Sequence, residues 1–414
     1  MKYLCFFTRD SLNQSYGTSI HLLDFFHALS DRYSIKVWEM NFENQKDLSL
    51  VSRCDCPSRI SISKLNSLCL NNKFHLNLDT LFVLPNKSKI IKTLSFIPRY
   101  GVLMRLLSKK SLRQAVIDRP FDSVGKCYEI EIVEAVTELY KPNLVGTNYA
   151  WLSNLVCHLP VRNFTFIHDL RSRNLQVLTK NGFESESLKS LEDEIAFSEK
   201  NDFLVTCNLQ DKREIESIVS EIPVVHVTLS EKFFPKTKLH SHTRQGIRLV
   251  YIDAGGFRDH EIRKFLKETW PNLTQKFPEV TLRIVGNICD YIQDLRYCPN
   301  VVMERWVDDL ERVYREADLA LVLHFYRGGI KLKLFEALQN GVPVIASEDA
   351  TDGLSLDLAN SIWNISSDTF NELLATIQMD RSTLAQYFGV QKRAAENFLY
   401  QGYSQFLEIL AKEY

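Results

Sequence analysis

The stretch Arg327–Ser347, RGGIKLKLFEALQNGVPVIAS, decides the fold that the sequence predicts. A strand-like run, Leu319–Phe325, precedes it, and residues 330–340 then show leucine and phenylalanine at the spacing of a buried helix face. Gly341 is placed to end this helix, and residues 342–346 resume as a short buried strand. A strand, a helix and a second strand in this order are typical of a parallel α/β sheet.

Two adjacent glycines, Gly328 and Gly329, open the predicted helix. They let backbone N–H groups approach a ligand closely at a helix start, where the dipole favours negative charge. Lys333 and Glu336 lie three residues apart and therefore share one helix face. A cation near a bound phosphate and a carboxylate that accepts ribose hydroxyls fit a sugar nucleotide. An exposed ion pair on an ordinary helix is the alternative, and the spacing alone favours it.

The residues from Gly328 to Leu338, followed by Gly341 to Ser347 and then Gly353-Leu354, resemble the nucleotide-sugar signature of family 4 glycosyltransferases. Most of the C-terminal half follows the same order of elements. The resemblance implies the GT-B architecture, an α/β fold in which two doubly wound Rossmann-like domains face a central cleft. One departure is Gly328, because many members carry a second glutamate eight positions before Glu336, although a recognised subgroup also has glycine. The role attached to that glutamate is not carried over.

Size and composition are those of an ordinary globular protein of two domains. The chain has 414 residues, of which 45% are hydrophobic and 24% charged. Its net charge of −1 gives no global field that would recruit nucleic acid. No apolar stretch reaches the roughly 20 residues that span a bilayer, and the first ten residues do not resemble a signal peptide. The nine scattered cysteines favour a reducing compartment, so we expect a cytoplasmic protein.

The expected domain limits follow the breaks in pattern along the chain. An N-terminal, acceptor-side Rossmann-like domain is predicted over 1–235 and a polar, basic linker over 236–246. A C-terminal, nucleotide-sugar-binding Rossmann-like domain is predicted over 247–396. The resemblance implies that a final helix, 397–414, packs back on the first domain.

The first domain is predicted to begin with a strand at residues 3–8, a loop, a helix at 18–30 and a strand at 35–38. This order is typical of a doubly wound sheet, whose ligands bind beyond the carboxyl ends of the strands. Gly17 lies in the opening loop. The resemblance implies that a glycine here lets the backbone approach the acceptor and the transferred group, and a plain helix-start glycine is the alternative.

His168 and Asp169 directly follow a predicted buried strand at residues 164–167. A strand end is where a doubly wound sheet presents ligand groups. The resemblance implies that a histidine here faces the cleft near the reacting sugar, and Asp169 would orient the imidazole. A structural histidine, with Asp169 capping the next turn, is the alternative.

A basic segment without any acidic residue runs from residue 80 to residue 117. It holds Arg105, Lys109, Lys110 and Arg113 beside an apolar side rich in leucine. Such a segment suits an anionic membrane surface, which would place the protein peripherally on the inner face of the membrane, or an acidic or lipid-diphosphate acceptor. A solvated helix face is the alternative.

A second glycine pair, Gly255-Gly256, follows a predicted strand at 247–252 and is again a place where backbone can approach a phosphate. Arg258 is two residues further on and is either a diphosphate ligand or a solvent-exposed side chain. The resemblance makes Trp306 and Val307 candidates for contacts with the nucleobase, with core packing of the tryptophan as the alternative.

The resemblance implies transfer of a sugar from a UDP- or GDP-sugar to a hydroxyl of a glycan, glycolipid or protein, with retention of configuration and as part of glycan or polysaccharide biosynthesis. No cofactor or metal is expected, since no Asp-x-Asp occurs in the chain. We assign the diphosphate to Gly328, Gly329, Lys331 and Lys333, with Ile330 beside it, and the ribose to Glu336. His168, Lys333 and Glu336 are the candidate catalytic residues. A sugar-nucleotide 2-epimerase and a non-catalytic sugar-nucleotide-binding subunit are the competing functions.

Overall fold

The computed structural model describes residues 2–8, 12, 17–39, 59–64, 67–70, 74–77, 127–174, 190–196, 198–235, 246–255, 259–324, 327–365, 368–401 and 403–412. The chain divides into two compact units. Unit 1 comprises Met1–Leu170, Lys189–Thr206 and Glu214–Val225, and unit 2 comprises Arg171–Leu188, Cys207–Arg213 and His226–Tyr414. Most of the predicted linker lies outside the described residues, and the domain limits stay a prediction.

Unit 1 is built on a seven-stranded sheet in the order β3-β2-β1-β6-β7-β8-β9. Its strands are β1 (Lys2–Thr8), β2 (Tyr33–Glu39), β3 (Ile60–Lys64), β6 (Leu144–Asn148), β7 (Asn163–Ile167), β8 (Phe203–Thr206) and β9 (Val224–His226). The register pairs from β3 through to β8 are all parallel. The strand order reverses between β1 and β6, so the loops after these two strands open at one point of the sheet edge. A separate antiparallel pair joins β4 (Ser67–Leu70) and β5 (Phe74–Asn77).

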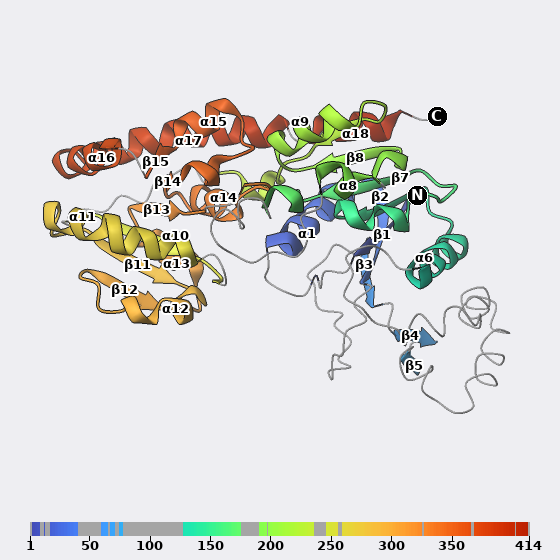
Figure 1. The fold of residues 1–414 in the computed structure, drawn as a ribbon, viewed down its shortest axis with the longest axis horizontal. Coiled ribbons are helices and arrows are strands. Elements are labelled where there is room, and N and C mark those ends of the chain that lie inside the picture. Colours follow the sequence, from blue (N-terminus) through green and yellow to red (C-terminus); the bar gives the residue numbers. More distant parts are fainter. Residues whose placement is uncertain are drawn as a thin grey trace. The chain divides into compact units, whose positions relative to one another are not determined.

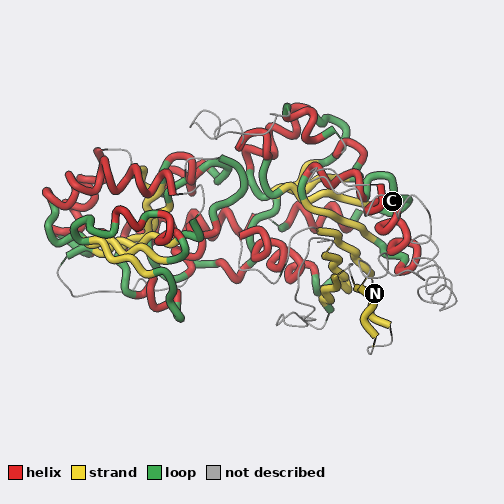
Figure 2. Tube along the Cα trace, turned by 60° about the horizontal axis from the view of Figure 1, so that its bottom comes forward, coloured by secondary structure: helices red, strands yellow, loops and turns green. Residues whose placement is uncertain are grey.

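Helices accompany the strands of unit 1, as Figure 2 shows in red beside yellow. They are α1 (Gly17–Leu29), α6 (Cys127–Tyr140) and α8 (Leu191–Ile195), with short 3-10 turns at Ala150–Leu155 and Ser198–Lys200. The first residues of α9 (Leu209–Ile218), up to Arg213, belong to unit 2, and the rest of this helix belongs to unit 1. Aromatic side chains join α1 to the sheet. Phe26 meets Phe6 with ring centroids 5.0 Å apart, and Phe25 meets Phe166 at the same distance. Strands covered on both faces carry nearly continuous apolar runs, which explains the apolar run Leu4–Phe7 of β1.

Unit 2 is built on a six-stranded sheet in the order β12-β11-β10-β13-β14-β15 (Figure 1). Its strands are β10 (Arg248–Ile252), β11 (Thr281–Val285), β12 (Val301–Glu304), β13 (Leu319–Val322), β14 (Val344–Ala346) and β15 (Trp363–Asn364). Every neighbouring pair is parallel. The reversal of order falls between β10 and β13, which is the arrangement of a nucleotide-binding doubly wound sheet.

Helices cover both faces of this sheet. The helices of unit 2 are α10 (Asp259–Lys264), α11 (Trp270–Lys276), α12 (Ile288–Tyr291), α13 (Leu310–Arg315), α14 (Leu332–Gln339), α15 (Leu356–Ser361), α16 (Asp368–Met379), α17 (Ser382–Gln401) and α18 (Ser404–Ala411), the last of which contacts α17. Leu249 and Tyr251 of β10 pack in one cluster with Trp270 of α11, while Val250 and Ile252, which point the other way, are buried as well. Alternate residues of each strand therefore serve two different layers of helix.

Three local features of the helices of unit 2 have physical causes. The predicted helix at 330–340 begins only at Leu332, because Gly328 and Gly329 have positive φ and Lys331 is extended. Helix α10 continues into α11 through a π-helical turn at Phe265–Thr269. Helix α13 is capped by Asp309, whose carboxylate accepts the N–H of Arg312 at 2.9 Å.

A buried glutamine ties α17 to the strand that follows α14. Gln391 is fully buried, accepts the N–H of Val344 at 2.8 Å and donates to the carbonyl oxygen of the same residue at 2.7 Å. Gln391→Leu leaves the buried Val344 N–H without this partner, so we expect the free energy of unfolding of unit 2 to fall by about 1–3 kcal/mol. Denaturant unfolding measures this. Val390→Ala, at an exposed position of the same helix, is the control, and an equal loss in both variants would contradict the assignment.

Candidate functional site

The two glycine turns of unit 2 follow strands that are neighbours in its sheet. Gly255 comes three residues after the end of β10, and Gly328 and Gly329 come six and seven residues after the end of β13. β10 and β13 pair in parallel, so their carboxyl ends lie at the same edge. This edge, at the reversal of strand order, is where doubly wound sheets hold their ligands.

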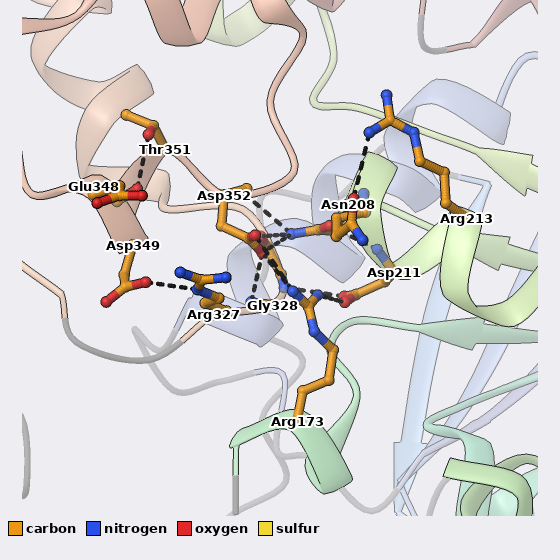
Figure 3. A network of polar contacts seen from close by, with 12 residues as sticks. Arg173, Asn208, Asp211, Arg213, Arg327, Gly328, Glu348, Asp349, Thr351 and Asp352 are labelled. Atoms are coloured by element: carbon orange, nitrogen blue, oxygen red, sulfur yellow. Dashed lines mark hydrogen bonds and ion pairs between the residues drawn. The ribbon is translucent and has the colours of Figure 1, made fainter. Parts of the chain in front are cut away.

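The backbone N–H groups of the turn before α14 are bonded to side chains of the protein itself (Figure 3). Gly328 donates to Oδ2 of Asp352 at 3.2 Å, and Gly329 donates to Oδ2 of Asp211 at 3.3 Å. The φ angles of the two glycines are 88° and 60°, which L side chains rarely adopt. The turn therefore needs glycine at both positions, and two carboxylates define its shape.

Arg173 joins the two carboxylates. Its guanidinium pairs with Asp211 and also contacts both carboxylate oxygens of Asp352, at 3.3 Å and 3.2 Å. The side chain of Asp211 is fully buried, whereas those of Arg173 and Asp352 are 12% and 13% exposed. Charged groups that are so little exposed to water need oppositely charged groups close by. Arg173 is that partner for Asp211 and Asp352, and the two carboxylates are the partners of Arg173.

Asn208 adds a second connection between the turn and the rest of unit 2. Its amide donates to the carbonyl oxygens of Gly329 at 2.8 Å and Asp352 at 3.2 Å. Its Oδ1 accepts the N–H groups of Gln210 and Asp211, which caps the start of α9. One asparagine thus couples the beginning of α9, the glycine turn and the loop after β14.

The cations beside the turn are also engaged. Lys331 is buried, and its ammonium donates to the carbonyl oxygen of Gly328 at 2.6 Å. Arg327 pairs with Asp349 at 2.7 Å, and this hydrogen bond raises the pKa of the arginine. The structure thus places the Lys331 ammonium against the backbone of the turn, while Ile330 is half-buried.

Lys333 and Glu336 form the predicted edge of α14. The Lys333 ammonium donates to Oε2 of Glu336 at 2.7 Å, and the two side chains are 33% and 18% exposed. The phenol of Tyr314 reaches the same oxygen at 3.4 Å. Burial, followed by the nearby glutamate, raises the pKa of Tyr314 well above its usual value, so the phenol stays a hydrogen-bond donor. Among the described residues, Oε1 of Glu336 has no hydrogen-bond partner.

The second glycine turn is described in part. Gly255 has a φ of 85°, and its N–H donates to Oδ1 of Asp253 at 2.7 Å. Gly256 and Arg258 lie outside the described residues. Trp306 is 78% exposed beyond the end of β12, which excludes core packing, and Val307 beside it is half-buried.

In unit 1, His168 lies directly after β7 in an aromatic cluster. Its ring centroid is 5.6 Å from that of His21 on α1 and 5.4 Å from that of Tyr149. Burial, and then the neighbouring His21, lowers the pKa of His168 well below its usual value, so the imidazole is neutral near pH 7. Asp169 is half-buried, and Gly17 is the first residue of α1. His21 and Tyr149 were not predicted from the sequence.

The remaining candidates lie outside the described residues or outside any cluster. Arg105, Lys109, Lys110 and Arg113 belong to a segment that is not described, so the membrane or acceptor role stays a prediction. Within the described ranges, no three or more His, Cys, Asp and Glu side chains are grouped so as to hold a metal ion. None of the described helices is both long and apolar enough to cross a membrane.

The group of side chains that is hydrogen-bonded to the glycine turn was not predicted from the sequence. These residues come from three separate segments, with Arg173 in the first, Asn208 and Asp211 in the second and Asp352 in the third, and only Asp352 adjoins the signature stretch. The one local signal is Asp352-Gly353, an aspartate and glycine pair typical of a turn. Only the tertiary structure brings these four residues to the glycine turn.

Gly353 gives a direct test of this arrangement. Its φ is 77°, and a Cβ at this position would overlap the side-chain amide of Asn208. Because that amide is held by four hydrogen bonds to backbone groups, it has no room to move aside. We expect Gly353→Ala to lower the free energy of unfolding by about 1–3 kcal/mol.

The matched control for this test is Gly389→Ala, in the interior of α17. Its Cβ would meet only an arginine nitrogen at 4.0 Å, so we expect no loss and a small gain from better helix propensity. Thermal or denaturant unfolding compares the two variants. Equal stability of both would show that the Asn208 contact does not constrain the turn.

Comparison with known proteins agrees with the fold and with the signature stretch. The family model "Glycosyl transferases group 1" matches residues 249–359. Comparison with curated proteins finds no match. The solved structure of sucrose-phosphate synthase from Thermosynechococcus elongatus is similar over 100% of both chains, with a TM-score of 0.62 and 13% identity.

Two further solved structures are similar along nearly the whole chain. Alr3699/HepE from Anabaena, in complex with UDP and glucose, has a TM-score of 0.58 and 12% identity over 99% of this chain and 100% of its own. The lipopolysaccharide outer core galactosyltransferase WaaB has a TM-score of 0.56 and 13% identity over the same shares. The chain therefore has the GT-B fold, and its residues 249–359 match the family model of the group 1 glycosyltransferases.

Proposed function

We propose that the protein is a glycosyltransferase that moves a sugar from a nucleoside-diphosphate sugar to an acceptor hydroxyl, with retention of configuration. The observation that carries the proposal is the Lys333–Glu336 edge of α14. It lies immediately after the glycine turn, at the carboxyl ends of β10 and β13, and both side chains are partly exposed. An ion pair at this edge of a nucleotide-binding sheet suits a ligand better than it suits a plain solvated face.

Glu336 is the proposed ribose ligand. Its Oε2 is occupied by Lys333 and Tyr314, while Oε1 has no partner among the described residues. A carboxylate can accept several hydrogen bonds, so Oε1 is available to the two hydroxyls of a ribose. Tyr314 and Lys333 hold the carboxylate in one orientation, which reduces the entropy lost on binding.

Lys333 and the first turn of α14 are the proposed diphosphate ligands. The N–H groups of Leu332 and Lys333 begin the helix, where no intrahelical carbonyl reaches them. Together with the Lys333 ammonium they face the negative charge that develops as the sugar leaves the diphosphate. Lys331 supports this arrangement indirectly, since its ammonium holds the carbonyl of Gly328.

The donor and acceptor classes are also part of the proposal. A UDP-sugar is supported by the similar HepE structures, which contain UDP with glucose and UDP-glucose. The glycan or glycolipid acceptor and its biosynthetic pathway follow from the resemblance. The neutral imidazole of His168 is the proposed contact with the reacting sugar, because a buried neutral histidine at a strand end can exchange hydrogen bonds with a hydroxyl.

One assay separates this function from its competitors. Purified protein is incubated with radiolabelled UDP- and GDP-sugars, and the products are separated over time. A transferase releases labelled sugar slowly to water even without its acceptor, an epimerase converts the donor, and a binding subunit leaves it unchanged. Conversion of the donor, or binding without any release, would overturn the proposed transfer.

Glu336→Ala removes the proposed ribose ligand. We expect the dissociation constant of the nucleoside diphosphate to rise by about tenfold or more. This rise corresponds to the binding free energy of one or two hydrogen bonds to a charged group. Isothermal titration calorimetry measures the binding, and thermal unfolding checks the fold. Glu372→Ala, at an exposed position of α16, is the control. Unchanged affinity in the Glu336 variant would remove this residue from the site.

Lys333→Ala removes the proposed charge at the leaving group. Because that charge matters most as the diphosphate dianion forms, we expect kcat to fall by about 100-fold while KM for the donor changes much less. Lys333→Arg keeps a cation at the edge and should restore part of kcat. Equal losses in kcat and in donor affinity, without rescue by arginine, would indicate ground-state binding alone.

A further inference from the structure

The two carboxylates at the glycine turn have different surroundings. Asp211 is fully buried and pairs with Arg173 and the Gly329 N–H, so its part is to hold the turn. Asp352 receives the Gly328 N–H but keeps 13% of its side chain exposed. Gly328 has no side chain, and Asp352 thus brings a carboxylate from another segment to this point of the turn (Figure 3).

The carboxylate of Asp352 retains capacity to accept hydrogen bonds. Its Oδ2 accepts from Gly328 and Arg173, and more weakly from Asn208 at 3.5 Å. Its Oδ1 accepts only from Arg173, at 3.3 Å, among the described residues. A carboxylate oxygen has two lone pairs, so at least one position on Oδ1 is open. Arg173 offsets part of the negative charge that Asp352 and Asp211 carry, and it fixes the plane of the Asp352 carboxylate.

The chemistry of this position favours hydroxyl groups over phosphate. A phosphate would be repelled by the carboxylate, and the N–H groups of Gly328 and Gly329 are already bonded to Asp352 and Asp211. Sugar hydroxyls, in contrast, donate hydrogen bonds to carboxylates. A nucleotide sugar would therefore place its diphosphate at the first turn of α14 and its sugar at Asp352.

We propose that Asp352 accepts hydrogen bonds from hydroxyl groups of the transferred sugar and so selects hydroxylated hexose donors. The proposal rests on the donor site proposed above. Arg173 and Asn208 are positioning residues that keep the carboxylate at the turn.

The test compares nucleotides with and without a sugar. Binding of UDP, UDP-glucose, GDP and GDP-mannose is measured by calorimetry on the wild-type protein, Asp352→Asn and Asp349→Asn. Asp349→Asn is the matched control, because it removes the same charge three residues away, from a pair with Arg327 that does not touch the glycines. Asparagine keeps the shape of Asp352 and an acceptor for the Gly328 N–H.

We expect Asp352→Asn to weaken binding of the sugar nucleotide by about tenfold, and binding of the matching free diphosphate by less than about twofold. The control should change neither. Equal weakening of both ligands would show that Asp352 only holds the turn, and tighter binding of both would show that it blocks the site. Either result overturns the proposal. If the wild-type protein binds none of the four probes, the donor site itself is wrong.

A second measurement starts from the wild-type protein. Monodeoxy analogues of the nucleotide sugar that binds are titrated into the wild-type protein, each lacking one hydroxyl. We expect the analogue that lacks one particular hydroxyl to bind the wild-type protein about tenfold more weakly than the full nucleotide sugar does. The same analogue should bind Asp352→Asn as tightly as the full nucleotide sugar binds that variant. Equal affinity of the wild-type protein for all the analogues overturns the proposal.

Discussion

The glycine turn before α14 depends on hydrogen bonds from its two N–H groups to carboxylates of other segments. Asp352 and Asp211 accept these bonds, and Arg173 forms an ion pair with both carboxylates. Because the charges are nearly or fully buried, loss of one member would leave another without compensation in a medium of low dielectric constant. The turn, the start of α9 and the loop after β14 therefore form one cooperative unit, and the position of α14 depends on it.

The parallel sheet of unit 2 determines where the glycine turn and its carboxylate partners lie. Reversal of the strand order between β10 and β13 opens the loops after both strands at one edge, and the first turn of α14 begins there. The polar residues of the site come from turns and helix starts, while the strands contribute apolar side chains to the layers of helix on both faces. Such a division lets the scaffold stay rigid while the loops carry the chemistry.

Much of unit 2 could be predicted from local pattern. Strands β10 and β14 form within the predicted ranges 247–252 and 342–346, and the Lys333–Glu336 edge forms as the three-residue spacing indicates. The Lys331 ammonium donates to the carbonyl oxygen of Gly328. The N–H groups of Gly328 and Gly329 are bonded to Asp352 and Asp211, and no local pattern predicted these two bonds. Contact of Gly328, Gly329 and Lys331 with a diphosphate stays a prediction.

The sequence by itself determined the α/β class, the two doubly wound sheets and the helix that carries Lys333 and Glu336. These follow from apolar periodicity and from glycine at turns, which act over a few residues. Only the tertiary structure decided which side chains meet the turn. Asp211 and Asp352 are separated by more than a hundred residues, and Arg173 joins them only because folding brings their segments together. Pairing of buried charges acts through space, so spacing along the chain does not predict it.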